Sequence, residues 1–137
     1  MKQAGYSGTP LLKKLGVKEG SRVAVIKPPA GFVDSLPELP FGATLSHRGR
    51  AKADVIVWFV MSSADLAGIA SAIDRMPDGS GMLWAAWPKK ASGVKTDLTE
   101  DVIRVAALRA GLVDTKVCAI DETWSGLRLS RRKSQPK

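Results

Sequence analysis

The sequence contains only one cysteine, Cys118, and one histidine, His47. A single cysteine cannot form an internal disulfide, which argues against a small secreted scaffold and fits a reducing compartment. A lone histidine without a cysteine or carboxylate at ligand spacing does not form a metal site. We therefore expect no metal ion, a surface position for His47 and a buried, unreactive thiol at Cys118.

Long apolar runs are also absent. The longest, Val55 to Met61, is far too short to cross a bilayer, and the N-terminal residues lack the apolar region of a signal peptide. These absences favour a cytoplasmic protein without a membrane segment.

Neither common nucleotide-binding motif is present. Two prolines, Pro28 and Pro29, follow the first expected strand, where a dinucleotide or methyltransferase fold carries a glycine-rich turn. A Walker A loop fails on spacing, because Gly93 is followed by Val94-Lys95-Thr96 and the position that requires the first glycine is Pro88. The pattern therefore predicts no cofactor bound in a standard mode.

Acidic residues are too few to balance the basic ones, which leaves a formal net charge of +8. Nine basic and three acidic side chains lie in residues 1–52, whereas residues 53–130 hold eight basic and ten acidic ones. The tail, residues 131–137, is basic. A basic N-terminal third and tail are compatible with nucleic-acid binding, although such a tail is commonly a solvated end.

Sequence patterns predict alternating strands and helices. Val23 to Ile26 is a β-branched run, the residues from Asp54 and from Gly81 are apolar without alternation, and two later segments have helical spacing and caps. In order, we expect a helix in 7–16 (N-cap Thr9, then Pro10), a strand at 23–26, a helical turn and short strand within 30–53, a strand at 54–61, a helix at 62–79, a strand at 81–87, a helix at 97–111, and strands at 113–120 and 124–130.

This order predicts an α/β fold, a three-layer Rossmann-like domain with a mainly parallel mixed sheet ending in an antiparallel strand pair. Residues 54–61 and 81–87 are expected as neighbouring parallel strands at its centre. We expect residues 1–130 to form one α/β domain, with an N-terminal helical segment at 1–20, and residues 131–137 to form a flexible basic tail.

The loop from Pro88 to Thr96 is the strongest candidate site. It follows a buried strand and precedes a helix whose free N–H groups attract anions. The candidate ligand-binding residues are Lys27, Ser62, Trp87, Lys89, Lys90, Ser92, Lys95 and Thr96. The alternative is that the lysines are solvated and the loop is only a connection. No catalytic residue is assigned, because the carboxylates of Asp121 and Glu122 have no partner for acid–base chemistry.

Three stretches carry a resemblance to a known family. They are DVIVWFV, GMLWAAWPKKASG with the following TDLTEDVIRVAALRAGL, and DETWSGLRLSRRK. They resemble a bacterial family of unknown function, DUF3052, over roughly the last 85 residues. The resemblance implies an α/β domain and brings no activity or catalytic residue.

Three functions remain open at this stage. The leading hypothesis is a non-catalytic protein that binds an anionic small molecule or a protein partner at the carboxyl ends of its parallel strands. The first alternative is a reduced methyltransferase-like enzyme with a non-standard cofactor loop. The second is nucleic-acid binding through the basic N-terminal third and tail.

Overall fold

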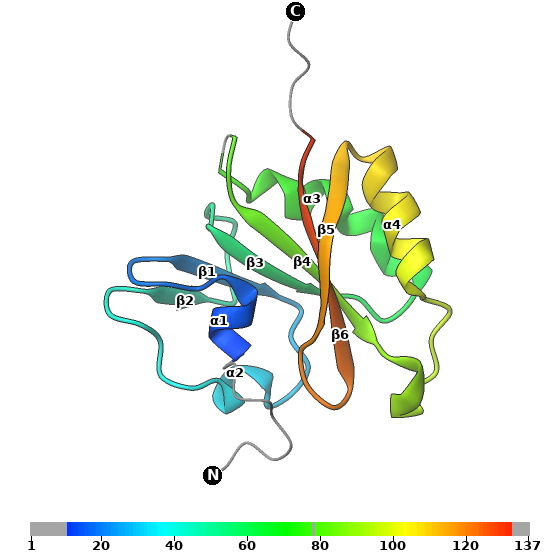
Figure 1. The fold of residues 1–137 in the computed structure, drawn as a ribbon, viewed down its shortest axis with the longest axis horizontal. Coiled ribbons are helices and arrows are strands. Elements are labelled where there is room, and N and C mark those ends of the chain that lie inside the picture. The colour runs from blue at the N-terminus through cyan, green and yellow to red at the C-terminus, as the bar shows by residue number, and fades with distance from the viewer. Residues whose placement is uncertain (1–10, 78, 133–137) are drawn as a thin grey trace, which may run out of the picture.

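A computed structural model describes residues 11–77 and 79–132 (Figure 1). Its elements are α1 (Leu11–Leu15), β1 (Arg22–Ile26), α2 (Phe32–Ser35), β2 (Thr44–Ser46), β3 (Val55–Phe59), the 3₁₀ helix η1 (Ser63–Gly68), α3 (Ile69–Asp74), β4 (Met82–Pro88), the 3₁₀ turn η2 (Lys90–Ser92), α4 (Glu100–Arg109), β5 (Leu112–Ala119) and β6 (Trp124–Arg131). The predicted caps Thr9 and Pro10, and most of the predicted tail, lie outside the described residues.

The strands form one six-stranded sheet in the order β2-β1-β3-β4-β6-β5. β2, β1, β3 and β4 pair in parallel, and β6 runs antiparallel to both β4 and β5. The predicted fold class is therefore confirmed, and so is the pairing of β3 with β4, which fill the two central positions.

Both faces of the sheet are covered, because β3 and β4 carry apolar side chains on each side. Figure 1 shows α1 and α2 against one face and α3 and α4 against the other. Ile56, Leu83 and Ala85 belong to the core under η1, α3 and α4, whereas Val57 and Trp84 belong to the core under α1 and α2. Alternate residues of an unbroken apolar run thus supply two cores.

The sequence predicts one continuous helix at 62–79, and this prediction is wrong. The chain instead makes η1 and then the short helix α3, which ends before Pro77. Gly68 lies at the junction, and glycine weakens a continuous α-helix. The Asp65 carboxylate also accepts a hydrogen bond from the Met61 backbone N–H (2.8 Å), which ties η1 to the end of β3.

The glycine of the W-S-G-x-R-L motif is explained by close packing. Gly126 lies in β6 opposite Ala86 of β4. A Cβ added at Gly126 would come within 2.9 Å of Ile120 Cδ1 and 3.1 Å of the Trp84 ring. The Trp84 indole N–H donates to the Leu15 carbonyl oxygen (3.0 Å), which fixes the ring in place. Gly126 thus leaves room for the Trp84 ring and the Ile120 side chain.

None of the helices in the described part of the chain has the length and apolar character needed to cross a membrane.

Candidate functional site

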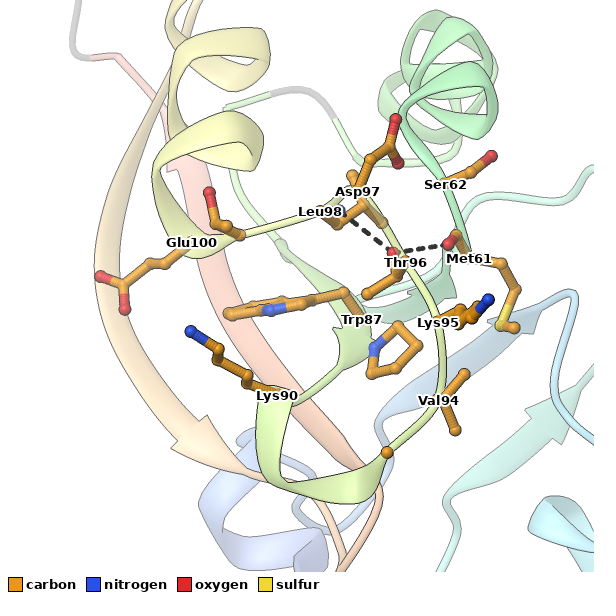
Figure 2. A pocket seen from close by; sticks show the side chains of 13 residues that line it. Met61, Ser62, Trp87, Lys90, Val94, Lys95, Thr96, Asp97, Leu98 and Glu100 are labelled. Atoms are coloured by element: carbon orange, nitrogen blue, oxygen red, sulfur yellow. Dashed lines mark hydrogen bonds between the residues drawn. The ribbon is translucent and has the colours of Figure 1, made fainter.

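A pocket of about 940 Å³ lies at the carboxyl ends of β3 and β4 (Figure 2). Its walls come from Met61 and Ser62 after β3, from Trp87 and Pro88 at the end of β4, and from the loop that leads into α4. The carboxyl ends of parallel strands are where open α/β sheets bind ligands.

Two hydrogen bonds of Thr96 hold the loop against β3. Its hydroxyl donates to the Met61 carbonyl oxygen (2.6 Å) and accepts from the Leu98 N–H (3.1 Å), as the dashed lines in Figure 2 show. The loop is therefore fastened to the neighbouring strand end and does not hang free in solvent.

Asp97 provides a second attachment. Its carboxylate accepts from the Ser63 N–H (2.8 Å) and from the Ser63 hydroxyl (2.5 Å), so the loop is tied to the start of η1. The hydroxyl bond, followed by the N–H bond, holds the pKa of Asp97 below its usual range.

The first part of the loop makes a tight turn. The Ser92 hydroxyl donates to the Lys89 carbonyl oxygen (2.7 Å) and accepts from the Val94 N–H (3.2 Å). Gly93 ends η2 with φ of 80°, a left-handed conformation that glycine adopts without steric cost. Ser92 and Gly93 therefore shape the loop, and this shape places Lys90 and Lys95 at the pocket.

The carboxylates around the pocket have internal partners, whereas the lysines have none among the described residues. The Asp97 carboxylate is bonded to Ser63, and the Glu100 carboxylate pairs with Arg104 of the same helix. The ammonium groups of Lys90 and Lys95 make no ion pair or hydrogen bond with any residue that the structure describes. Lys90 and Lys95 therefore bring positive charge to the pocket that no described residue neutralises.

An apolar floor lies beneath these charges. Trp87 is 6% exposed and Leu98 is 5% exposed, and both line the pocket. The indole N–H of Trp87 makes no hydrogen bond within residues 11–77 and 79–132. In Figure 2, Lys90 and Lys95 lie on either side of Trp87, and Asp97 directs its carboxylate away from it.

The structure divides the eight sequence candidates into three groups. Ser62, Trp87, Lys90, Lys95 and Thr96 line the pocket. Lys89 and Ser92 belong to the turn before it, where the Lys89 N–H donates to the Thr123 carbonyl oxygen (2.8 Å). Lys27 is separate, because it lines a different pocket that also contains Trp58.

Sequence reasoning missed the residues that orient the loop. The sequence offers Thr99 or Asp97 as the cap of this helix; Thr99 caps α4 by accepting from the Val102 N–H (3.2 Å), whereas Asp97 reaches Ser63. Such a contact joins residues 34 apart in sequence, and no local pattern signals it. Glu100, in the first turn of α4, also lines the pocket and was not among the eight sequence candidates.

Other reactive groups do not form a cluster. In the described ranges, no three His, Cys, Asp or Glu side chains are placed to hold a metal ion. His47 is exposed, and Cys118 is partly buried in β5, where burial raises the pKa of its thiol. A raised pKa lowers the thiolate fraction at neutral pH and makes this cysteine a poor nucleophile.

Solved structures with a similar fold include methyltransferases. A ribosomal protein L11 methylase from Lactobacillus delbrueckii subsp. bulgaricus has a TM-score of 0.59 and 13% identity, over 90% of this chain and 75% of the other. A SAM-dependent methyltransferase from Aquifex aeolicus has a TM-score of 0.57 and 15% identity, over 87% and 86%. LepI in complex with SAM has a TM-score of 0.51 and 12% identity, over 96% of this chain and 50% of LepI. At these identities the likeness shows a Rossmann-like, methyltransferase-like fold alone.

No curated protein matches the sequence. The model of one protein family does match, and it covers residues 44–133, from β2 to beyond the end of β6. The proteins of this family are described as having an unknown function. The matched span includes all three stretches that carried the resemblance, as well as the pocket at the ends of β3 and β4. The chain therefore belongs to the DUF3052 family of proteins of unknown function.

Proposed function

We propose that this protein binds a small anionic molecule in the pocket at the ends of β3 and β4, without catalysing a reaction there. The observation that carries the proposal is the contrast between the charges: both pocket carboxylates have partners, while Lys90 and Lys95 have none in the described chain. An anion beside either lysine would receive a charge-assisted hydrogen bond that no internal group supplies.

The expected affinity shows what kind of anion fits. Each lysine is exposed, so an ion pair with phosphate contributes about 0–1 kcal/mol. Even two such pairs, about 2 kcal/mol at most, give inorganic phosphate a Kd of about 30 mM or weaker. A ligand whose apolar part buries about 100 Å² of apolar surface, its own included, gains about 2.5 kcal/mol more. We therefore propose a ligand that joins a phosphate or carboxylate to an apolar part lying against Trp87 and Leu98.

Backbone amides at the start of α4 contribute less than a free helix end would. The Leu98 N–H already donates to Thr96, and the Val102 N–H donates to Thr99. The proposed anion is therefore held mainly by Lys90 and Lys95, with the helix end as a weaker, longer-range attraction.

Thermal unfolding with and without phosphate tests the proposal. At a phosphate concentration about ten times its Kd, a specific site raises Tm by roughly 3–6 °C. The double substitution Lys90→Ala and Lys95→Ala should abolish this increase. Phosphate also stabilises proteins by exclusion from their surface, so the matched control is Lys13→Ala with Lys18→Ala, two exposed lysines outside the pocket. If both double variants respond to phosphate like the parent, the loop is a solvated connection.

The methyltransferase-like alternative makes a different prediction in the same assay. Its support is the fold of the similar structures, which include a SAM-dependent methyltransferase and LepI in complex with SAM. S-adenosylmethionine should then raise Tm by several degrees, and the increase should not depend on Lys90 and Lys95. The nucleic-acid alternative predicts salt-dependent retention on heparin. Either result, without a phosphate response, would replace the anion-binding proposal.

A further inference from the structure

A second pocket, of about 510 Å³, lies on the sheet face that carries α3. Its floor is formed by Ile26 at the end of β1 and Trp58 of β3, one wall by Gly49 and Arg50 of the β2–β3 loop, and the other by η1 and α3. It shares no lining residue with the pocket described above. Any ligand here would be recognised independently.

Arg75 is the unusual residue of this second pocket. Arg75 follows α3, is only 7% exposed as a residue, and is one of the residues that line the pocket. Its Nε–H donates to the Ala51 carbonyl oxygen (2.9 Å), and its two Nη groups make no hydrogen bond to another described residue. Neither Nη belongs to the buried side-chain atoms that lack a partner in the described residues, so both reach solvent and can donate to an anion. This geometry leaves it poised for an anion.

The other charges of the pocket are not paired with one another. Lys27 and Arg50 add two exposed cations, and Asp65 and Asp74 are the two lining carboxylates. None of the ion pairs found in residues 11–77 and 79–132 joins any of these groups. Asp65 is bonded to the Met61 N–H. The pocket thus carries an excess of positive charge, with the largely buried residue Arg75 at its wall.

Trp58 gives the pocket an apolar surface beside these cations. It is 3% exposed, and its indole N–H has no hydrogen-bond partner in the described part of the chain. Gly68 covers it only lightly, since a Cβ at this position would lie 3.7 Å from Trp58 Cζ2. Space therefore remains next to the indole that a larger residue at 68 would fill.

We propose that this pocket is a second ligand site, which binds a small planar anion: a flat ring that carries a carboxylate or a phosphate. The acid group pairs with Arg75, Lys27 and Arg50 add longer-range positive charge, and the ring packs against Trp58 in the space left by Gly68. Aromatic carboxylates and nucleotides share this chemistry.

The indole N–H signals of a ¹⁵N-labelled protein test the site directly. The chain has four tryptophans, and Trp→Phe variants assign the signals of Trp58 and Trp87. Adenosine monophosphate and benzoate serve as the two probes. At least one should shift the Trp58 signal saturably. A response to benzoate alone identifies an aromatic carboxylate site, and a response to adenosine monophosphate alone identifies a nucleotide site.

Two variants address the mechanism. Gly68→Leu should weaken the Trp58 response at least tenfold by filling the space, and the exposed pair Lys27→Ala with Arg50→Ala should weaken it by removing charge without touching the core. The double variant Lys90→Ala with Lys95→Ala should leave the Trp58 response unchanged. A failure of the anion-binding proposal for the first pocket can therefore be distinguished from a failure of this one. The proposal is overturned if neither probe moves the Trp58 signal, or if the signal moves equally in the parent and in the charge variant.

Discussion

At the scale of single residues, the packing of Trp84 explains why position 126 is a glycine. Trp84 is completely buried, and Gly126 is the position on β6 that leaves room for its ring. The sequence motif showed that a glycine lies in a strand, where glycine is usually unfavourable. Only the fold shows which ring needs the space.

Gly126→Ala should therefore destabilise the protein by about 1–3 kcal/mol, since the added methyl group overpacks a tight core. The Ile120 side chain can move, but the Trp84 ring is held by its hydrogen bond to Leu15. Urea unfolding measures the difference. Gly68→Ala is the control, because a Cβ there makes only an ordinary contact with Trp58. Equal stability of both variants would contradict the packing explanation.

The Asp97–Ser63 contact predicts a pH dependence. The pKa of Asp97 is lowered in the folded protein, first by the Ser63 hydroxyl and then by the Ser63 N–H. A lowered folded pKa stabilises the fold above the unfolded value of about 3.9, and this contribution is lost as the pH falls through the folded value. Acidification below about pH 4 should therefore loosen the loop from η1.

Ser63→Ala should raise the pKa of Asp97 toward, but not up to, its ordinary value, because the Ser63 N–H still donates. A carboxyl ¹³C titration measures this pKa. Ser62→Ala is the matched control, as its hydroxyl makes no hydrogen bond with another described residue. An unchanged Asp97 pKa in Ser63→Ala would show that the hydroxyl does not hold the carboxylate in solution.

At the scale of elements, the strands were predictable and their order was only partly so. β3 and β4 are unbroken apolar runs, and no edge strand has this composition, so their central position follows from the sequence. The placement of β6 between β4 and β5 does not follow, because a short turn predicts antiparallel pairing without showing which strand of the pair joins the sheet. The η1–α3 break also escaped prediction, because the helical spacing of Leu66, Ile69 and Ile73 continues across Gly68.

Ile56→Asp tests the central position of β3. Ile56 is completely buried, and an unpaired charge there costs about 3–5 kcal/mol, against a total stability of about 5–15 kcal/mol. The variant should lose its folded circular-dichroism spectrum or unfold at far lower urea. Val117→Asp on the edge strand β5 is the control, since Val117 is 49% exposed. Near-equal stabilities of the two variants would show that β3 is not buried on both faces.

The candidate site shows the same difference. Residues beside a strand end or a helix start could be predicted from the local sequence, whereas contacts between distant segments could not. Lys90, Lys95 and Trp87 could be identified from their place after a buried strand and before a helix. Lys27 was grouped with them because all follow strand ends, yet it lines the other pocket. Arg75 was not identified at all. It follows a helix with no unusual neighbours, and only its burial against the β2–β3 loop gives it significance.

At the scale of the whole molecule, the two pockets lie toward different parts of the same sheet. One is built on the ends of β3 and β4, and the other on β1, β3 and the β2–β3 loop. The fold is shared with methyltransferases, but a fold supports many functions, and the residues of the site determine which one. Here the turn after β1 contains Lys27, Pro28 and Pro29 in place of a glycine-rich loop.

The most direct test of the anion-binding pocket is a crystal soaked in selenate, a phosphate-sized anion whose anomalous signal marks its position. The crystal form must leave the ends of β3 and β4 open to solvent. We predict an anomalous peak at the ammonium group of Lys90 or of Lys95, in the pocket beside Trp87, that is absent from crystals of the Lys90→Ala, Lys95→Ala variant. Selenate peaks at other surface lysines, with none in this pocket, would contradict the proposed function.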